Sequence, residues 1–327
     1  MTGATGGLGL ALVPALLARG YQVRASGRDR SAGERLRAAG AEFVAADLTD
    51  PAVAAPLAAD RDVVFHAAAL SSLWGPPAAF AAINVEATVR LLAGARQAGC
   101  DAFIYVSTPS VYAEARDRLD LTEDSPLAKR FANAYVATKF TAEQSVLAAN
   151  GPGFATVAIR PRALVGPDDR VLLPRLLRVA RSGFFPLFRG GRALIELTDV
   201  NDAAEALVAA DLRRASLGGR VFNVSGGAPM SVRDVVGAVF AAVGLAPRLV
   251  EAPFAFAAGA CALAEAVCAH WPSRPEPPAT VYSLMTLAFS QTFDLRGVRE
   301  ALSWAPRVSP EEAIARTAAL WRRHAPV

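Results

Sequence analysis

The chain opens with MTGATGGLG (residues 1–9), and this stretch decides the fold. Gly3, Gly6 and Gly9 have the spacing of a turn that lets backbone amides approach a phosphate group. Apolar residues with helical spacing follow at 8–19, and the N-terminus of such a helix offers N–H donors and a positive dipole to an anion. The turn and the start of the helix are therefore the predicted pyrophosphate site of a dinucleotide, formed by Gly3, Thr5, Gly6, Gly7, Leu8 and Gly9.

Strands and helices alternate through the first half of the chain. Short β-branched or apolar runs predict strands at residues 21–26, 42–46, 62–67, 102–107 and 155–160. Helical spacing predicts helices at residues 8–19, 32–39, 51–58, 78–98 and 132–149, and Gly20, Gly40 and Gly99 stand at expected C-caps. The alternation predicts an α/β fold built on a doubly wound parallel sheet of the Rossmann type.

The second half of the chain has a looser pattern. Helices are predicted at 171–182, 231–243 and 310–323, strands at 194–197 and 220–224, an apolar loop at 183–188 and a stiff connector at 271–278. We predict a dinucleotide-binding Rossmann domain over residues 1–165 and 192–225. A smaller α/β substrate domain over 166–191 and 226–327 should cover the carboxyl edge of the sheet, where ligands bind in such folds.

The glycine turn has almost no strand before it. A turn of this kind normally leaves the end of a buried central strand of about five or six residues. Four buried apolar side chains there would contribute about 6–12 kcal/mol, which is comparable with the ~5–15 kcal/mol stability of a whole domain. Since only Met1 precedes Thr2, we expect the first strand to be missing from this sequence and the native protein to start several residues upstream.

Composition excludes several classes of partner. The 327 residues are 53% hydrophobic and carry a net charge of +4, but no basic stripe with interleaved aromatics suggests nucleic acid. Three cysteines and three histidines are too few and too dispersed for a metal site. Sparse cysteine favours a reducing compartment, and we expect the cytoplasm. The apolar stretch at 255–269 is short for a membrane span, so a packed helix is favoured and contact with a membrane surface stays open.

The end of the second predicted strand bears on the choice of cofactor. Enzymes that use NAD place an acidic residue there for the ribose hydroxyls, whereas NADP enzymes offer a cation instead. Gly27 takes the acidic position and Arg28 follows with a guanidinium suited to a 2′-phosphate, which favours NADP(H) over NAD(H). In the alternative, Arg28 is only solvated and Asp29 serves NAD. Asp47 and Leu48 end the next strand and are placed to meet the adenine, although Asp47 could instead cap the helix near Pro51.

Tyr135 and Lys139 are spaced i, i+4 in NAYVATKF, so their side chains leave one face of a helix. An ammonium beside a phenol favours the phenolate and lowers the pKa of the tyrosine. Such a pair also occurs on helix surfaces without function. The strand end IYVSTPSVY, however, supplies hydroxyl groups at Ser107, Thr108 and Ser110. A glycine turn, an activated phenol and a positioned donor together indicate hydride transfer.

The motifs TGATGGLG, STPSVY, YVATK and RPRALVGP together resemble those of the extended short-chain dehydrogenases/reductases, over essentially the whole chain. The segments LIELTDVNDAAEAL and RVFNVSGG are most similar to the 3β-hydroxysteroid dehydrogenase branch, which includes bacterial 2-alkyl-3-ketoacid reductases. The resemblance implies an NAD(P)-dependent oxidoreductase. It assigns catalytic roles to Thr108, Tyr135, Lys139 and Asn84, with Lys139 also binding the ribose. It assigns cofactor contacts to Ala67, Ala68, Ala69, Pro161 and Leu164.

The resemblance implies carbonyl reduction or its reverse on an apolar substrate, such as a 2-alkyl-3-ketoacid or a 3β-hydroxysteroid-like molecule. The candidate substrate contacts are aromatic: Trp74, Tyr112, Phe184 and Phe185. An alternative of equal weight is that Phe184 and Phe185 only pack inside the smaller domain. The main alternative is a nucleotide-sugar epimerase or dehydratase, and a third is a non-catalytic NADP-binding regulatory protein. The resemblance also implies a homodimer through the helices at 78–98 and 132–149.

Overall fold

The computed structural model describes residues 1–169, 172–271 and 275–324. Its main sheet contains, in spatial order, β2 (Glu42–Ala45), β1 (Arg24–Gly27), β3 (Val63–His66), β4 (Ala102–Val106), β6 (Ala155–Pro161) and β11 (Arg220–Val224). Every strand pairing within it is parallel. Thr2 lies between the two central strands and forms bridges to Ser26 of β1 and His66 of β3. The glycine turn therefore leaves the centre of the sheet, as the sequence predicted.

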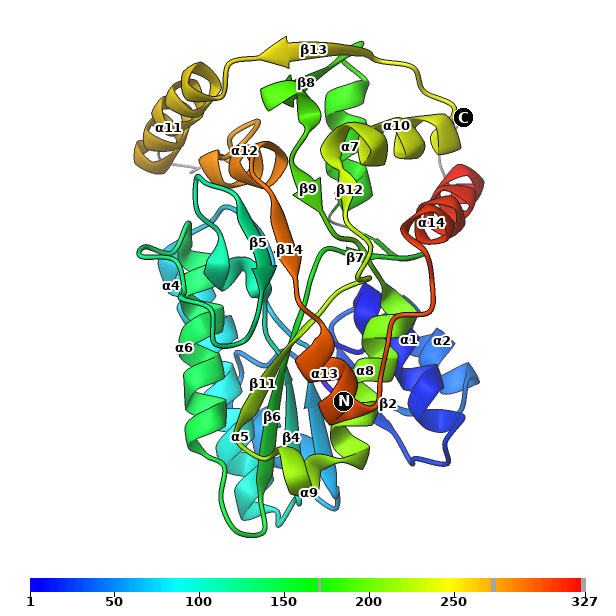
Figure 1. Ribbon diagram of the computed structural model, residues 1–327. Coiled ribbons are helices and arrows are strands. Elements are labelled where there is room, and N and C mark those ends of the chain that lie inside the picture. The colour runs from blue at the N-terminus through cyan, green and yellow to red at the C-terminus, as the bar shows by residue number, and fades with distance from the viewer. Residues whose placement is uncertain (170–171, 272–274, 325–327) are drawn as a thin grey trace.

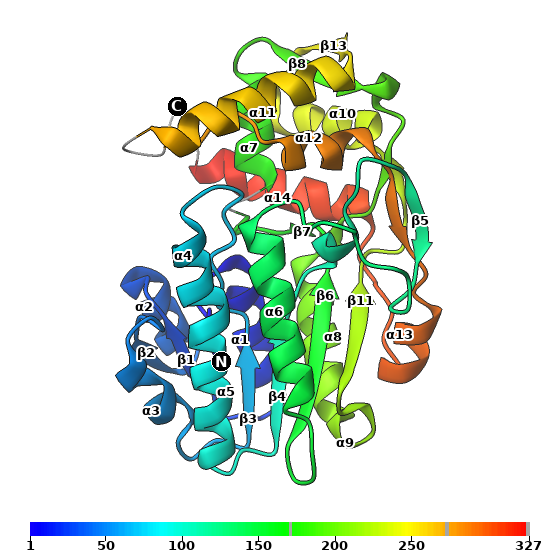
Figure 2. The same ribbon diagram turned by 90° about the vertical axis from the view of Figure 1, so that its left-hand side faces the viewer.

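Helices cover both faces of this sheet (Figure 2). One face carries α1 (Gly7–Leu17), α2 (Arg30–Ala38) and α8 (Val200–Leu212), and the other carries α3 (Ala54–Ala58), α5 (Ala87–Gln97) and α6 (Ala134–Ala148). Alternate residues of β4 serve the two faces: Ile104 packs with α1 and α8, whereas Phe103 and Tyr105 pack with α5 and α6. The doubly wound Rossmann-type sheet is thus confirmed.

The helix predicted at 78–98 is interrupted. It consists of α4 (Pro77–Phe80), the π-helical segment η2 (Ala81–Glu86) and α5. The wider turn of a π-helix brings Asn84 inside, where the side chain is 1% exposed. By length and composition alone Pro77–Gln97 could span a membrane, and 44% of its most apolar part is buried in the protein.

A second layer lies above the carboxyl ends of the strands (Figure 1). Its core joins α7 (Leu172–Ala180), α10 (Val232–Val243), α14 (Pro310–His324) and β8 (Phe184–Phe188). The prediction of a loop over residues 183–188 is wrong, because β8 pairs in parallel with β13 (Arg248–Ala252). The predicted connector at 271–278 lies partly outside the described residues. The apolar helix α11 (Phe254–His270) and the short α12 (Val281–Ala288) complete this layer.

The segment before α14 returns to the first layer. Val298 and Leu302 of α13 (Arg296–Leu302) are fully buried in the core that α1 and α8 form, and the Trp304 Nε1 donates to the Asp202 carbonyl at 3.0 Å. These residues were assigned to the substrate domain from the sequence but pack against the Rossmann domain. A mixed sheet of β12 (Met230–Ser231), β9 (Leu194–Ile195), β14 (Gln291–Phe293) and β5 (Arg118–Leu121) lies between the layers.

Short elements make up the remaining connections. They are η1 (Pro51–Val53), η3 (Pro109–Tyr112), η4 (Arg189–Gly191), β7 (Leu164–Val165), β10 (Thr198–Asp199) and α9 (Arg214–Leu217). The predicted C-cap glycines Gly20, Gly40 and Gly99 have φ angles of +81°, +103° and +76°, so all three adopt the left-handed conformation that favours glycine.

Candidate active site

Backbone contacts explain two of the three glycines in the opening turn. A Cβ on Gly3 would lie 2.5 Å from the Ala68 nitrogen, and one on Gly9 would lie 2.4 Å from the Gly3 oxygen. Gly6 is different: it is the N-cap of α1, and its added Cβ would meet only the Gly3 oxygen, at 3.4 Å. The protein itself therefore tolerates a side chain at Gly6. The exposed N-terminus of α1 forms an open cradle for an anion at this position.

The tip of β1 carries an exposed arginine, Arg28. Gly27 packs against Thr5, whose Oγ1 would lie 2.3 Å from an added Cβ, so no acidic side chain fits there without a shift. Asp29 accepts a hydrogen bond from the Ala32 amide at 3.0 Å as the N-cap of α2. The pKa of Asp47 is lowered mainly by hydrogen bonds from Thr49, and the nearby charge of Arg28 lowers it further.

Asp47 is held in its own turn. Its carboxylate accepts hydrogen bonds from the amide of Thr49 at 2.9 Å and from the hydroxyl of Thr49 at 2.8 Å. The cap near Pro51 that the sequence left open for Asp47 belongs to Asp50, which accepts from the Ala52 amide at 2.9 Å. Leu48 is half-buried beside it.

Asn84 joins the segment after β3 to α6. Its Oδ1 accepts from the Leu70 amide at 2.7 Å, and its Nδ2 donates to the Leu70 carbonyl at 3.2 Å and to the Thr138 Oγ1 at 3.1 Å. The segment 67–69 passes beneath Gly3 and is half-buried. Asn84 therefore fixes the backbone beside the glycine turn and is not a surface residue of its helix.

His66 is a structural residue of this region. It is fully buried, with Nδ1 2.6 Å from the Thr2 Oγ1 and Nε2 2.8 Å from the Thr88 Oγ1. Burial, followed by the nearby Lys139 charge, lowers the pKa of His66 to about 3. The ring is therefore neutral near pH 7 and serves as a hydrogen-bonded spacer.

Tyr135 and Lys139 lie in the first turns of α6, which begins after the Asn133 N-cap. The Lys139 ammonium donates to the Val106 carbonyl at 2.5 Å and lies 4.1 Å from the centre of the Tyr105 ring. Lys139 is buried, and burial lowers its pKa to about 7 although Glu143 opposes the shift. A buried lysine that contacts the strand end is not a surface helix pair.

Burial dominates the chemistry of the Tyr135 phenol. It raises the pKa of Tyr135 to about 12, the nearby Tyr282 adds to the rise, and a hydrogen bond with the Thr108 side chain opposes it. The sequence predicted a lowered pKa through Lys139, and that prediction is wrong for this structure, because desolvation of the phenol is the largest influence on its pKa. Tyr135 is therefore a protonated acid near pH 7.

A line of hydroxyl groups continues from Tyr135 into the second layer. Thr108, the N-cap of η3, donates to the Ser110 Oγ at 2.9 Å. The Ser110 Oγ lies 2.7 Å from the Tyr282 hydroxyl, which α12 supplies. The sequence gave no signal for Tyr282, since 147 residues separate it from Tyr135 and only the fold brings them together.

Arg162 borders the same cluster and was also not among the predicted site residues. It follows β6 directly and is 8% exposed. Burial lowers the pKa of its guanidinium, while Tyr282 and Glu196 oppose that shift, so both lie near it. Pro161 and Leu164, the predicted neighbours of a nicotinamide, are half-buried on either side, at the end of β6 and the start of β7.

The structure assigns Tyr112 to the core and corrects its predicted contact with substrate. Its ring is fully buried, and its hydroxyl accepts from Arg160 at 2.6 Å and donates to the Thr122 carbonyl at 3.2 Å. Arg160 also forms a buried ion pair with Glu143 of α6. Tyr112 therefore connects η3 to β6 and α6.

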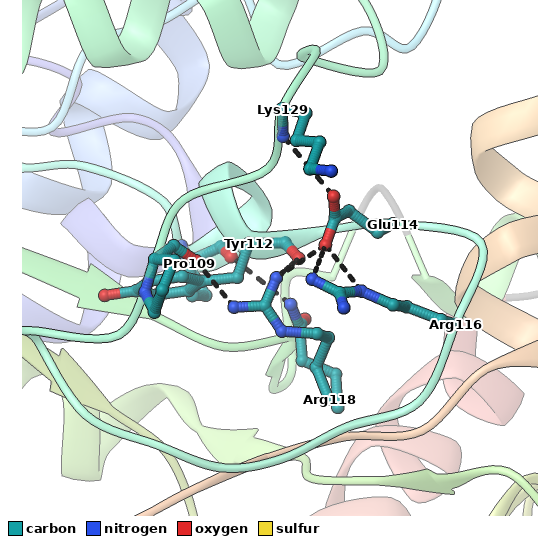
Figure 3. A network of polar contacts seen from close by, with 8 residues as sticks. Pro109, Tyr112, Glu114, Arg116, Arg118 and Lys129 are labelled. Atoms are coloured by element: carbon teal, nitrogen blue, oxygen red, sulfur yellow. Dashed lines mark hydrogen bonds and ion pairs between the residues drawn. The ribbon is translucent and has the colours of Figure 1, made fainter.

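The loop that follows Tyr112 is held by Glu114 (Figure 3). The Glu114 Oε2 accepts from Arg116 at 2.7 Å and from Arg118 at 2.8 Å, and its Oε1 accepts from the Lys129 amide at 3.4 Å. Arg118 also donates to the Tyr112 carbonyl at 3.4 Å. These contacts fix the loop that leads away from Thr108.

The predicted aromatic contacts of β8 do not surround the cluster. Phe185 is 1% exposed and packs against Phe240 of α10, with ring centres 5.4 Å apart, whereas Phe184 is 51% exposed. Both belong to the second layer itself, which was the alternative left open. Trp74 is half-buried in the loop before α4.

Comparison with known proteins agrees with this geometry. Residues 1–225 match the model of a family described as the NAD dependent epimerase/dehydratase family. The 4-hydroxy-2-methyl-3-oxo-4-farnesyl-3,4-dihydroquinoline-1-oxide ketoreductase of Stigmatella aurantiaca is 35% identical over 96% of this chain and 93% of that protein. The 2-alkyl-3-oxoalkanoate reductase of Stenotrophomonas maltophilia is 35% identical over 97% of each.

Solved structures share the fold. MoeE5 in complex with UDP-glucose and NAD matches with a TM-score of 0.77 over 98% of this chain and 97% of that one. At 24% identity this likeness concerns the fold alone.

Proposed function

The chain belongs to the NAD dependent epimerase/dehydratase family, and from this premise we propose that it reduces the keto group of an apolar substrate with NADPH, or runs the reverse oxidation of a secondary hydroxyl. It is an NAD(P)-dependent oxidoreductase of the extended short-chain type. The observation that carries the proposal is the protonated Tyr135 phenol within hydrogen-bonding reach of Thr108.

The residues present fit a dinucleotide. Gly6 leaves the N-terminus of α1 open, so the α1 amides would hold the pyrophosphate, and Lys139 would hold the nicotinamide ribose. When bound, the cofactor supplies the hydride for the carbonyl carbon. Tyr135 then gives its phenolic proton to the carbonyl oxygen. Thr108 turns its hydroxyl hydrogen from Ser110 toward the same oxygen and stabilises the developing negative charge.

Support for an apolar ketone comes from the relatives. Two of them are named as reductases of keto compounds that carry alkyl or farnesyl chains. The alternative, a nucleotide-sugar epimerase or dehydratase, is supported by a fold shared with a protein that binds UDP-glucose. A non-catalytic regulatory protein is disfavoured, because Tyr135 and Lys139 are both present.

The proposal is tested by following NADPH and NADH oxidation with three substrates in parallel: a long-chain 2-alkyl-3-ketoacid, a 3-ketosteroid and a UDP-sugar. Oxidation of NADPH in the presence of the ketoacid or the ketosteroid supports the proposed reductase activity. Conversion of the UDP-sugar, with no oxidation by either ketone, would move the protein to the epimerases and refute the proposal.

The preference for NADP(H) rests on Arg28. Replacing it by alanine removes the exposed positive charge directly after Gly27, so we expect the Kd of NADPH to rise about 10–100-fold. The Kd of NADH should change less than about threefold. Fluorescence titration measures both. Arg37→Ala, at the far end of α2 and paired with Glu34, is the matched control. An equal rise in the Kd of NADPH and NADH would show that Arg28 does not recognise the 2′-phosphate.

Gly6 provides a separate test of the pyrophosphate site. Because the φ of −86° suits alanine and an added Cβ has no close protein neighbour, Gly6→Ala should leave the Tm unchanged. The methyl group would occupy the phosphate cradle, so the Kd of NADPH should rise at least about tenfold. In Gly9→Ala the Cβ would meet backbone at 2.4 Å, and there we expect lower stability as well. Unchanged affinity in Gly6→Ala would place the cofactor elsewhere.

We further propose that the protein acts in the cytoplasm as a homodimer. Its cysteines, Cys100, Cys261 and Cys268, are free thiols, which suits a reducing compartment. Helices α5 and α6 lie side by side on one face of the sheet, where the dimer would form (Figure 2). Peripheral contact with a membrane would involve α11, since Phe256 is 80% exposed there and Leu263 is 68% exposed.

A further inference from the structure

Arg162 is a buried arginine that the described residues leave without a paired charge. Its Nε is shielded from solvent and has no hydrogen-bond partner, and within the described ranges no hydrogen bond or ion pair holds the guanidinium. A buried charge without a partner is costly, and arginines in protein interiors are normally paired. The mechanism above gives this side chain no task.

The position of Arg162 connects it with the reacting carbonyl. Tyr282 contributes to the pKa shifts of both Tyr135 and Arg162, so it lies in the neighbourhood of both side chains. The Tyr282 hydroxyl lies 2.7 Å from the Ser110 Oγ, which accepts from Thr108. A group that extends from a carbonyl held by Tyr135 and Thr108 toward Tyr282 would approach the guanidinium.

Glu196 is the acidic residue that influences the pKa of Arg162, and each of its carboxylate oxygens accepts a hydrogen bond from another group. Oε1 accepts from the Phe293 amide at 3.1 Å, and Oε2 accepts from the Ser225 hydroxyl. Burial also raises the pKa of Glu196, although Ser225 and Arg162 oppose this. Glu196 therefore balances part of the charge from a distance, and among the described residues it forms no hydrogen bond or ion pair with the guanidinium.

We propose that Arg162, assisted by Tyr282, binds a carboxylate of the substrate next to the keto group, so that the enzyme acts on keto acids and not on simple ketones. The planar guanidinium donates two parallel hydrogen bonds that match a carboxylate. This inference rests on the proposed reductase function. Hydride and proton add across the C=O bond to give a hydroxy acid, NADPH becomes NADP⁺, and the carboxylate is unchanged.

The first test compares three substrates in the wild-type protein with NADPH: a freshly prepared 2-alkyl-3-ketoacid, its methyl ester and the ketone formed by loss of CO₂. We expect kcat/KM for the acid to exceed that for both neutral compounds by about 100-fold, the order for losing a charged hydrogen-bond pair. Equal kcat/KM for all three compounds overturns the inference, whatever happens to any variant.

The second test uses Arg162→Gln. We expect kcat/KM for the acid to fall about 100-fold, mainly through KM, while the ester and the ketone stay within about threefold. Arg162→Lys keeps the positive charge but not the planar pair of N–H donors, so kcat/KM for the acid should lie between those of Arg162→Gln and wild type. Arg178→Gln, which removes an exposed arginine from α7, is the matched control and should behave like wild type. Equal losses for acid and neutral substrates in Arg162→Gln would overturn the inference.

The thermal melt separates binding from a structural role. Removing an unpaired buried charge should leave the Tm within about 2 °C of wild type or raise it, whereas a structural arginine would lower it clearly. Failure of the inference and of the reductase function are also distinguishable. Reduction of the ester as fast as the acid, lost in Tyr135→Phe, overturns the inference alone. Turnover of UDP-glucose with no reduction of any keto compound overturns both.

Discussion

Replacing Tyr135 by phenylalanine is expected to lower kcat for ketone reduction by about 10²–10⁴-fold, the usual contribution of a general acid. The reason is that the phenol, which forms a hydrogen bond with the Thr108 side chain, is the proposed proton donor to the carbonyl oxygen. Burial raises the pKa of Tyr135 to about 12, so the donor is protonated at any pH between 6 and 9 and its removal should be felt equally throughout that range. The decrease in NADPH absorbance with a 2-alkyl-3-ketoacid measures the rate.

Tyr21→Phe is the matched control for this change. Burial also raises the pKa of Tyr21 to about 12, and its hydroxyl bonds to Asp211 at 2.7 Å, away from Thr108. We expect this variant to keep wild-type kcat, although it loses a hydrogen bond. In Tyr135→Phe the Kd of NADPH should be unchanged, because the phenol is not among the proposed cofactor contacts. A kcat within tenfold of wild type would remove Tyr135 from its catalytic role.

Local patterns predicted the Rossmann part of the chain well. The strand at β2 begins where short-range alternation placed it, and β11 matches its predicted range. These segments are bounded by turn residues close in sequence, and their apolar runs are long enough to show one periodicity. The glycine turn and the Tyr135–Lys139 spacing were visible for the same reason, since each lies within a few consecutive residues.

Non-local contacts explain what the sequence did not reveal. The segment GFFPLF resembles a loop because of its glycine and proline, and β8 forms only by pairing with β13, which lies about sixty residues further along the chain. Tyr282 reaches the Tyr135 cluster from a distant segment, and no short motif contains it. Arg162 lies within the motif RPRALVGP, but nothing in that motif indicates that the fold brings the side chain to the cluster. Tyr112 was assigned to substrate as an aromatic near Thr108, but the partner that fixes it, Arg160, is 48 residues away.

The buried pair of Glu143 and Arg160 leads to the largest expected effect on stability. Arg160 donates from Nε to the Glu143 Oε2 at 2.7 Å and from Nη2 to Oε1 at 2.5 Å, with side-chain exposures of 4% and 0%. Glu143→Gln removes the negative charge and leaves the Arg160 guanidinium buried without its partner. We expect the free energy of unfolding to fall by about 3–5 kcal/mol, measured by urea denaturation.

Two comparisons show whether burial is the cause. Glu205→Gln breaks the half-exposed pair with Arg19 and should cost no more than about 1 kcal/mol. The double change Glu143→Leu with Arg160→Met removes both charges and should recover most of the stability that the single change loses. If Glu143→Gln costs no more than Glu205→Gln, the pair does not hold α6 to β6.

Because Glu143 also raises the pKa of Lys139, Glu143→Gln should lower that pKa further below about 7. The buried pair of Glu143 and Arg160 would then have two effects: it would hold α6 in place and would help to keep Lys139 charged.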